Sequence, residues 1–132
     1  MISSHEEMIT FGEELAEQLR SKVVCFEGDL GAGKTTLIKG IISKLTSVDP
    51  DSITSPTFNI MSMYDDLLHF DCYRIKSSQE FMAMGLDDEL TSKKTILIEW
   101  PEKIASLLPK QRVTIRIEHV SQNAREVVIV QN

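Results

Sequence analysis

The chain has 132 residues, 42% of them hydrophobic, and this size and composition suit one compact domain spanning residues 1–132. Its 14 basic and 20 acidic residues give a net charge of −6, the wrong sign for gripping a nucleic-acid backbone unaided, so any nucleic acid should be held by a partner. No wholly apolar run exceeds four residues, too short for a membrane span, and the two cysteines lack metal-ligand spacing, so a reduced, cytoplasmic protein is expected.

The first half of the chain predicts a helix, a strand and a second helix. Ser4 with Glu7 fits a capping box, and apolar residues then recur at helical spacing as far as Leu19. The apolar and mostly β-favouring run at 23–26 predicts a short buried strand. After a glycine-rich segment, residues 35–45 carry Leu and Ile at i, i+3 and i+4 spacing, which predicts a helix with one apolar face.

The second half predicts mostly strands. Residues 48–56 are rich in Asp, Ser and Pro and should form a loop. A hairpin should follow, with strands at 57–64 and 67–70 joined by a turn at Asp65-Asp66. The remaining elements are predicted as a weak helix at 79–84 closed by Gly85, an apolar strand at 95–99, and two antiparallel strands with one solvated face around 113–117 and 128–130.

The segment at 28–35, GDLGAGKT, matches the phosphate-binding pattern G-x-x-x-x-G-K-[ST] and sits between a predicted strand and a predicted helix. Its glycines allow backbone angles that point N–H groups inward, and the next helix offers its positive N-terminal end to phosphates. Lys34 should reach the β- and γ-phosphates, and the Thr35 hydroxyl should bind Mg²⁺. We therefore expect an α/β fold: a single P-loop NTPase-like domain with a central, mainly parallel sheet, antiparallel additions and flanking helices.

Hydrolysis also needs a carboxylate at the end of a neighbouring strand, to hold magnesium, and a group that orients the attacking water. Two predicted strands end in an acid, at Asp71 and at Glu99. We favour Glu99 for the metal, directly or through water, and Asp71 for the attacking water or the second metal shell. The alternative for each is a surface charge that merely ends a strand.

Three further residues have open interpretations. Thr57 resembles a switch threonine that senses the γ-phosphate, and a turn threonine without that role is nearly as favoured. Trp100 could cover the site or meet a partner, or it could be a half-buried packing residue. His69 is a lone histidine on a strand and is assigned no role, because such residues are more often part of the core.

The motifs GDLGAGKTT, SPTF, HFDCYR, GLDDEL and IEWPE occur in that order, and together they resemble the TsaE family of bacterial ATPases. The resemblance extends over nearly the whole chain. It implies a role in making threonylcarbamoyladenosine beside the anticodon of tRNAs that read codons starting with adenine. It further implies that the chain docks on the heterodimer of the transferase TsaD and its paralogue TsaB, and that ATP hydrolysis resets that complex between turnovers, so that tRNA is met only through the complex.

The same resemblance implies specific contacts, with Asp71 and Trp100 tied to hydrolysis and function. Magnesium would be held by Thr35 with Glu99. The sequence departs from the family at Ala124, where glycine is usual, and at Met8, where threonine is common. The implied contacts to nucleotide come from Leu30, Gly31, Ala32, Gly33, Lys34 and Thr35 in the loop, from His5, and from Ala124-Arg125.

Other functions remain open from the residues alone. A small-molecule P-loop kinase usually needs an arginine-rich lid, and the five arginines here form none. A GTPase needs an N-K-x-D motif for guanine, which is missing from the sequence, so ATP is favoured. A third possibility is an ATP-dependent binding module in which the nucleotide only stabilises a partner-competent shape and turnover is not required.

Overall fold

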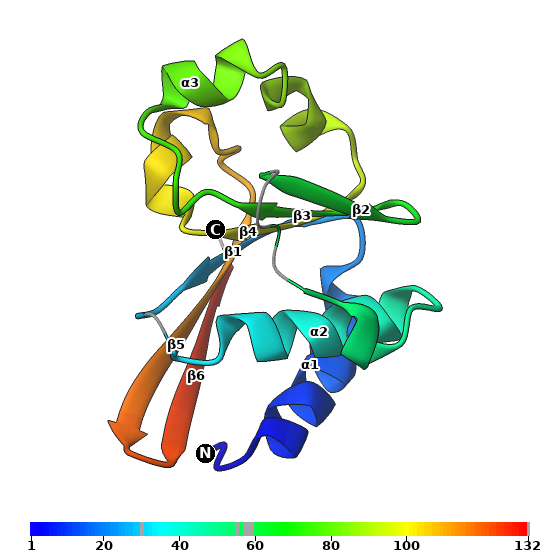
Figure 1. The fold of residues 1–132 in the computed structure, drawn as a ribbon, viewed down its shortest axis with the longest axis vertical. Coiled ribbons are helices and arrows are strands. Elements are labelled where there is room, and N and C mark those ends of the chain that lie inside the picture. The colour runs from blue at the N-terminus through cyan, green and yellow to red at the C-terminus, as the bar shows by residue number, and fades with distance from the viewer. Residues whose placement is uncertain (30, 55, 57–59, 132) are drawn as a thin grey trace.

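The computed structural model describes residues 1–29, 31–54, 56 and 60–131 of the chain. Within them, a six-stranded sheet with the order β2-β3-β4-β1-β5-β6 divides two layers of helices (Figure 1). The pairs β3·β4, β4·β1 and β1·β5 are parallel, while β2 and β6 add antiparallel edges. The elements are α1 (His5–Leu19), β1 (Val23–Glu27), α2 (Lys34–Leu45), η1 (Pro50–Ser52), β2 (Met61–Tyr64), β3 (Leu67–Asp71), α3 (Ser78–Ala83), η2 (Asp87–Thr91), β4 (Thr95–Glu99), η3 (Pro101–Leu107), β5 (Val113–Ser121) and β6 (Ala124–Gln131).

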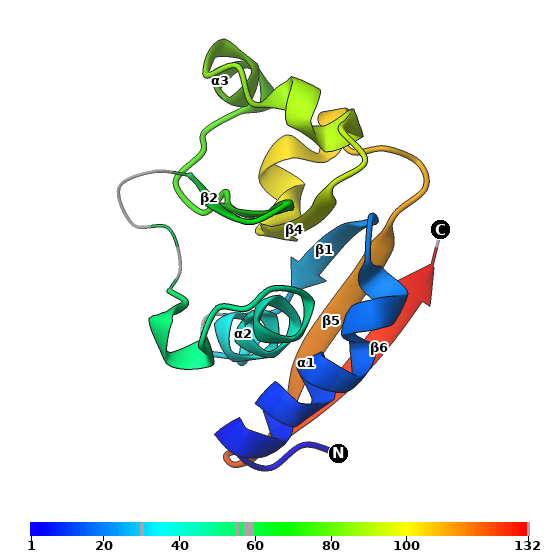
Figure 2. The same cartoon turned by 90° about the vertical axis from the view of Figure 1, so that its right-hand side faces the viewer.

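This architecture confirms the predicted α/β class with its mainly parallel sheet and antiparallel additions. The central strands are buried on both faces, which explains why β1 and β4 read as continuous apolar runs rather than as alternating patterns. One face packs against α1 and α2, and the other packs against α3 and the 3₁₀ helices η2 and η3 (Figure 2). None of the helices in the described residues is long and apolar enough to cross a membrane.

The N-terminal cap of α1 is close to the one that the sequence predicts. The Ser4 hydroxyl accepts a hydrogen bond from the Glu7 N–H at 3.1 Å, which satisfies one of the free donors of the first turn. The Glu7 carboxylate completes the arrangement one residue earlier than in a standard capping box, because it accepts from the N–H and the hydroxyl of Ser3. Helix α1 therefore starts at a fixed position beside the glycine-rich loop.

Two glycines allow α1 and α2 to pack closely. A Cβ atom at Gly12 of α1 would stand 2.5 Å from the Leu37 carbonyl oxygen, and one at Gly40 of α2 would lie closer still to the Ile9 carbonyl oxygen. Both obstacles are backbone atoms, so they cannot rotate away as the end of a side chain would. The crossing of these helices depends on the absence of a side chain at both positions.

Substituting Gly40→Ala should therefore lower the free energy of unfolding by about 1–2 kcal/mol. Overpacking of a core costs about 1–3 kcal/mol, and about 2–3 kcal/mol is expected here because the obstacle is backbone, while alanine returns roughly 1 kcal/mol through its better helix propensity. Chemical denaturation would measure the loss, with Lys44→Ala on the exposed part of the same helix as the control. A Gly40→Ala protein as stable as the wild type would contradict the close approach of the two helices.

The structure also departs from the predicted element boundaries. Strand β2 begins at Met61 in the structure, and the predicted start of this strand at Thr57 lies outside the described residues. The 3₁₀ helices η2 and η3 were not predicted, because their turns are too short to establish a helical period. Strands β5 and β6 are longer than their apolar segments, because the hairpin extends beyond the layer formed by α3, η2 and η3 (Figure 1).

Candidate nucleotide-binding site

The carboxyl ends of three neighbouring parallel strands meet the start of α2. Phe26 of β1 is in register with Glu99 of β4, and Glu99 is in register with Asp71 of β3. In open α/β sheets, ligands bind in the crevice outside this end of the strands. The glycine-rich loop lies here because it connects β1 to α2, so the predicted phosphate loop and both predicted acids share one edge of the sheet.

Two glycines give the loop its shape. Gly28 has φ +152°, and a Cβ atom there would stand 2.8 Å from the Ile117 carbonyl oxygen of β5. Gly33 has φ +107° at the N-cap of α2, a conformation that side chains rarely tolerate. Gly33 has no side chain to cap this helix, and the positive end of the α2 dipole at this position favours an anion. Leu30 lies outside the described residues, and its predicted contact to nucleotide stays a prediction.

Lys34 is held inside the loop although it is charged, and only 5% of it is exposed. Its Nζ donates to the Gly28 carbonyl oxygen at 2.7 Å and lies 3.6 Å from the centre of the Trp100 ring. Burial lowers the pKa of Lys34, while the nearby carboxylates of Glu99, Glu102, Asp71 and Asp29 act in the opposite direction. The ammonium group can therefore exchange the Gly28 carbonyl and the Trp100 ring for phosphate oxygens, and it would stay in a polar environment throughout.

Trp100 follows the last residue of β4 with φ 57° and ψ 53°, a left-handed conformation that is an outlier for a bulky residue. This conformation turns the indole back over Lys34, and the ring also lies 5.0 Å from the Tyr73 ring between centroids. The same side chain packs against the core cluster that includes Phe81 and Ile104. The packing alternative is therefore seen in the structure, while the covering of a nucleotide site by Trp100 stays a prediction. Backbone strain of this kind is concentrated at functional sites.

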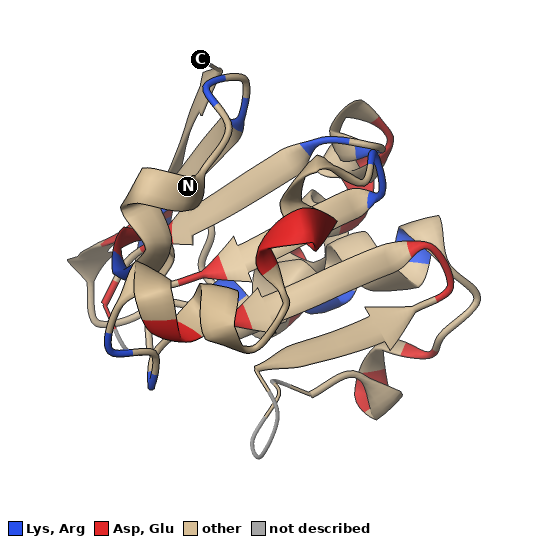
Figure 3. Ribbon diagram, turned by 90° about the horizontal axis from the view of Figure 1, so that it is seen from above, with Lys and Arg blue, Asp and Glu red and all other residues tan. Residues whose placement is uncertain are grey.

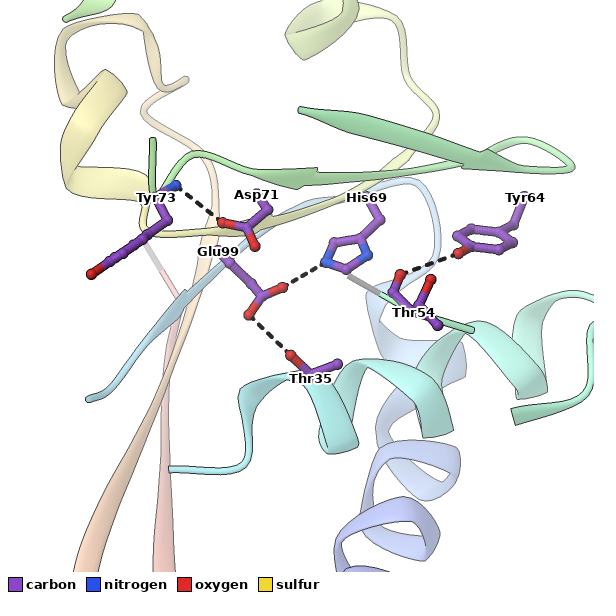
Figure 4. A network of polar contacts seen from close by, with 7 residues as sticks. All are labelled: Thr35, Thr54, Tyr64, His69, Asp71, Tyr73 and Glu99. Carbon is purple, nitrogen blue, oxygen red and sulfur yellow. Dashed lines mark hydrogen bonds and ion pairs between the residues drawn. The ribbon is translucent and has the colours of Figure 1, made fainter. Parts of the chain in front are cut away.

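Glu99 and Thr35 bring two side-chain oxygens together at the start of α2 (Figure 4). Glu99 is 3% exposed, and the Thr35 hydroxyl donates to its Oε1 at 3.4 Å, longer than a usual O–H···O hydrogen bond of about 2.5–3.0 Å. The described residues contain no cluster of three or more His, Cys, Asp or Glu that could hold a metal. Mg²⁺ fits this donor set, because it keeps several waters and binds through one or two protein oxygens together with substrate phosphates.

Asp71 lies on the same sheet edge as Glu99 but is held differently. Its Oδ1 accepts from the Tyr73 N–H at 3.0 Å, and the side chain is half-buried. Burial raises the pKa of Asp71, the Tyr73 N–H lowers it, and the negative charge of Glu99 raises it further. The structure therefore places Asp71 beside Glu99 on the neighbouring strand, with its carboxylate bonded to the Tyr73 N–H rather than to Thr35 in the described contacts. Thr57, the predicted switch threonine, lies outside the described residues.

A cavity of about 210 Å³ lies beside the loop, where the start of α1 and the β5–β6 turn approach it. His5 lines this cavity, and its Nδ1 is 3.5 Å from the Thr36 hydroxyl of α2. From the predicted pair at 124–125, only Arg125 lines the cavity. Backbone hydrogen bonds of 2.7 and 2.9 Å between Arg125 and Ile2 join the chain's start to β6 and so close this side of the site. The residues around the cavity are Ile2, Ser3, Ser4, His5, Met8, Gly31, Ala32, Gly33, Thr36, Gln122, Asn123 and Arg125.

Sequence reasoning left one buried residue of this site without a role. His69 is 0% exposed, and its Nε2 lies 2.8 Å from Oε2 of Glu99. Residues 69 and 71 are two apart on one strand, so both point to the same face of the sheet. This period of two was the signal in the sequence, because it places the histidine on the face that carries Asp71.

Comparisons with known proteins agree with this fold. A family model described as "Threonylcarbamoyl adenosine biosynthesis protein TsaE" matches residues 2–127. A relative from Rickettsia conorii named "tRNA threonylcarbamoyladenosine biosynthesis protein TsaE" is 36% identical, over 99% of this chain and 77% of the relative. The protein of the same name from Haemophilus influenzae is 32% identical, over 93% of this chain and 82% of its own length. A crystal structure of Bacillus subtilis YdiB has a TM-score of 0.75 at 32% identity and covers 96% of this chain and 79% of that one.

Proposed function

Because this chain belongs to the TsaE family, we propose that it is the ATP-binding, weakly ATP-hydrolysing subunit required for threonylcarbamoyladenosine modification of tRNA. The observation that carries the ATPase assignment is the meeting of Lys34, Thr35 and Glu99 at the carboxyl end of the central strands. A P-loop binds the phosphates, and hydrolysis also needs a carboxylate at the end of the neighbouring strand to hold magnesium.

The proposed reaction uses these residues in sequence. Lys34 exchanges the Gly28 carbonyl for the β- and γ-phosphates of ATP, and the N–H groups at the start of α2 bind phosphate oxygens. Mg²⁺, when bound, neutralises charge that develops on the phosphates, and Thr35 and Glu99 would hold it. Asp71 orients the attacking water, and Trp100 covers Lys34 against solvent. The cavity that His5 lines takes the nucleoside.

We propose that the chain acts by docking on the heterodimer of TsaB and TsaD in the cytoplasm, where ATP hydrolysis resets the transferase between turnovers. Its charge supports an indirect contact with tRNA, because the net charge is −6 and Lys and Arg are scattered over separate helices and loops between acidic positions (Figure 3). The tRNAs modified would be those that read codons beginning with adenine.

A mixture of this chain with TsaB, TsaD, ATP, tRNA and the threonylcarbamoyl donor tests this function, with ATP hydrolysis and tRNA modification measured together. We expect weak hydrolysis by the chain alone, faster hydrolysis when TsaB and TsaD are added, and repeated rounds of modification only when all three proteins and ATP are present. Sustained modification with a non-hydrolysable ATP analogue would favour a binding module instead. Transfer of the γ-phosphate to a metabolite would favour a kinase.

A further inference from the structure

His69 contacts the carboxylate that the proposed function assigns to magnesium. Its Nε2 is 2.8 Å from Oε2 of Glu99, while Oε1 of the same carboxylate accepts from the Thr35 hydroxyl at 3.4 Å (Figure 4). The three side chains come from β3, β4 and α2, so they are joined only by the tertiary fold. Each oxygen of Glu99 therefore faces a different polar group.

The hydrogen bond between His69 and Glu99 fixes which ring nitrogen carries the hydrogen. A carboxylate oxygen can only accept, so Nε2 of His69 must be the donor. The other ring nitrogen, Nδ1, is buried and has no hydrogen-bond partner in the part of the chain that the structure describes. Within that part, Glu99 is thus the group that sets the orientation of this imidazole.

The position of His69 on the sheet explains how it reaches Glu99. His69 is in register with Leu97, two residues before Glu99 on β4, and both strands carry these side chains toward α2. The imidazole therefore approaches Glu99 diagonally along the sheet, from the side away from the loop. Glu99 is left with Oε1 directed to Thr35 and with its other oxygen held by a rigid, buried donor.

We propose that His69 is a positioning residue for ATP hydrolysis, which holds the Glu99 carboxylate in the orientation that presents Oε1 to the metal-binding side of the loop. This inference rests on the proposed function, in which Thr35 and Glu99 hold magnesium. Outer partners of this kind orient a metal-binding group, and their loss typically costs about 10- to 100-fold in metal affinity or activity. Nucleotide binding without magnesium does not involve this orientation and is unaffected.

Amide substitutions separate this role from simple packing. In His69→Gln the amide nitrogen is as many bonds from Cα as Nε2 of histidine, so the donor to Glu99 is kept. In His69→Asn the amide reaches only as far as Nδ1, so the donor is lost although the side chain stays polar. His69→Leu fills the buried space without any donor. The Gln and Asn variants form the matched pair, and their comparison separates the positioning role from packing even if the Leu variant fails to fold.

Calorimetry with ATP, with and without Mg²⁺, and steady-state hydrolysis should be measured on all variants. We expect His69→Asn and His69→Leu to lose about 10- to 100-fold in turnover and to need correspondingly more Mg²⁺, with magnesium-free binding unchanged. His69→Gln should keep most of the wild-type turnover and a magnesium requirement close to that of the wild type. Equal impairment of Gln and Asn, or a normal magnesium response in Asn and Leu, would overturn the positioning role.

A measurement on the nucleotide-free wild type keeps this inference distinct from the proposed function. Nitrogen-15 NMR of labelled histidine should show a hydrogen on Nε2 of His69, and an Nε2 that carries no hydrogen would overturn the contact with Glu99. Failure of the proposed function has another signature. If the wild type binds magnesium and ATP, and the His69 variants change magnesium binding as above, but no ATP is ever hydrolysed, then ATP hydrolysis is refuted while the contact of His69 with Glu99 is not.

Discussion

Lys34→Ala should weaken ATP binding by about 10- to 100-fold. The substitution removes an ammonium group that the loop holds 2.7 Å from a backbone carbonyl and over the face of Trp100, ready to be transferred to phosphate. A hydrogen bond to a charged group contributes about 1.5–3 kcal/mol, and each 1.4 kcal/mol is about tenfold in Kd. Isothermal titration calorimetry with ATP would measure the change directly.

The matched control for this loss is Lys44→Ala, which removes the same charge from an exposed position near the end of α2. Its affinity for ATP should stay within a factor of two or so of the wild type, since exposed charges more than about 10 Å apart are largely screened at 0.1 M salt. Unchanged affinity in Lys34→Ala would refute the phosphate-binding role of the loop. If a Lys34→Ala chain loaded with ATP still supported tRNA modification, the binding-module alternative would be favoured.

The phosphate loop could be predicted from sequence because its determinants are local. The glycines, Lys34 and Thr35 are consecutive, and the apolar run before them and the helical period after them are also read over short windows. The pairing of Glu99 with this loop could be predicted as well, since a strand that ends in an acid has few positions in a parallel sheet. The fold followed from the same local patterns.

The remaining site contacts depend on tertiary geometry, because a local pattern can place a side chain on a face of the sheet but cannot name its partner. Trp100 reaches Lys34 only because its backbone is left-handed, a conformation that sequence does not favour for a bulky residue. His69 reaches Glu99 because β3 and β4 are neighbours in one register, although 30 residues separate the two. Arg125 joins the site through an isolated bridge to Ile2, at the opposite end of the chain.

Glu99→Gln should reduce magnesium-dependent ATP hydrolysis about 100-fold or more while sparing nucleotide binding. The amide keeps the size of the side chain but removes the charge that Mg²⁺ prefers, and metal-assisted charge stabilisation is worth several kcal/mol in the transition state. Nucleotide affinity rests on Lys34 and on the N–H groups of α2, which the substitution leaves in place. Steady-state hydrolysis and calorimetry on the same protein preparation would measure the two effects separately.

Glu102→Gln tests whether charge alone explains such a result. Glu102 is exposed and acts on Lys34 electrostatically, as Glu99 does, but only Glu99 also accepts from the Thr35 hydroxyl in the described contacts. If the general negative charge around Lys34 governed turnover, both variants would slow to a similar degree, and the metal-binding assignment would be wrong. Loss of magnesium-free ATP binding in Glu99→Gln would contradict it too, because the carboxylate would then support the loop itself. Selective loss of turnover in Glu99→Gln is therefore the result that requires a carboxylate at the end of β4.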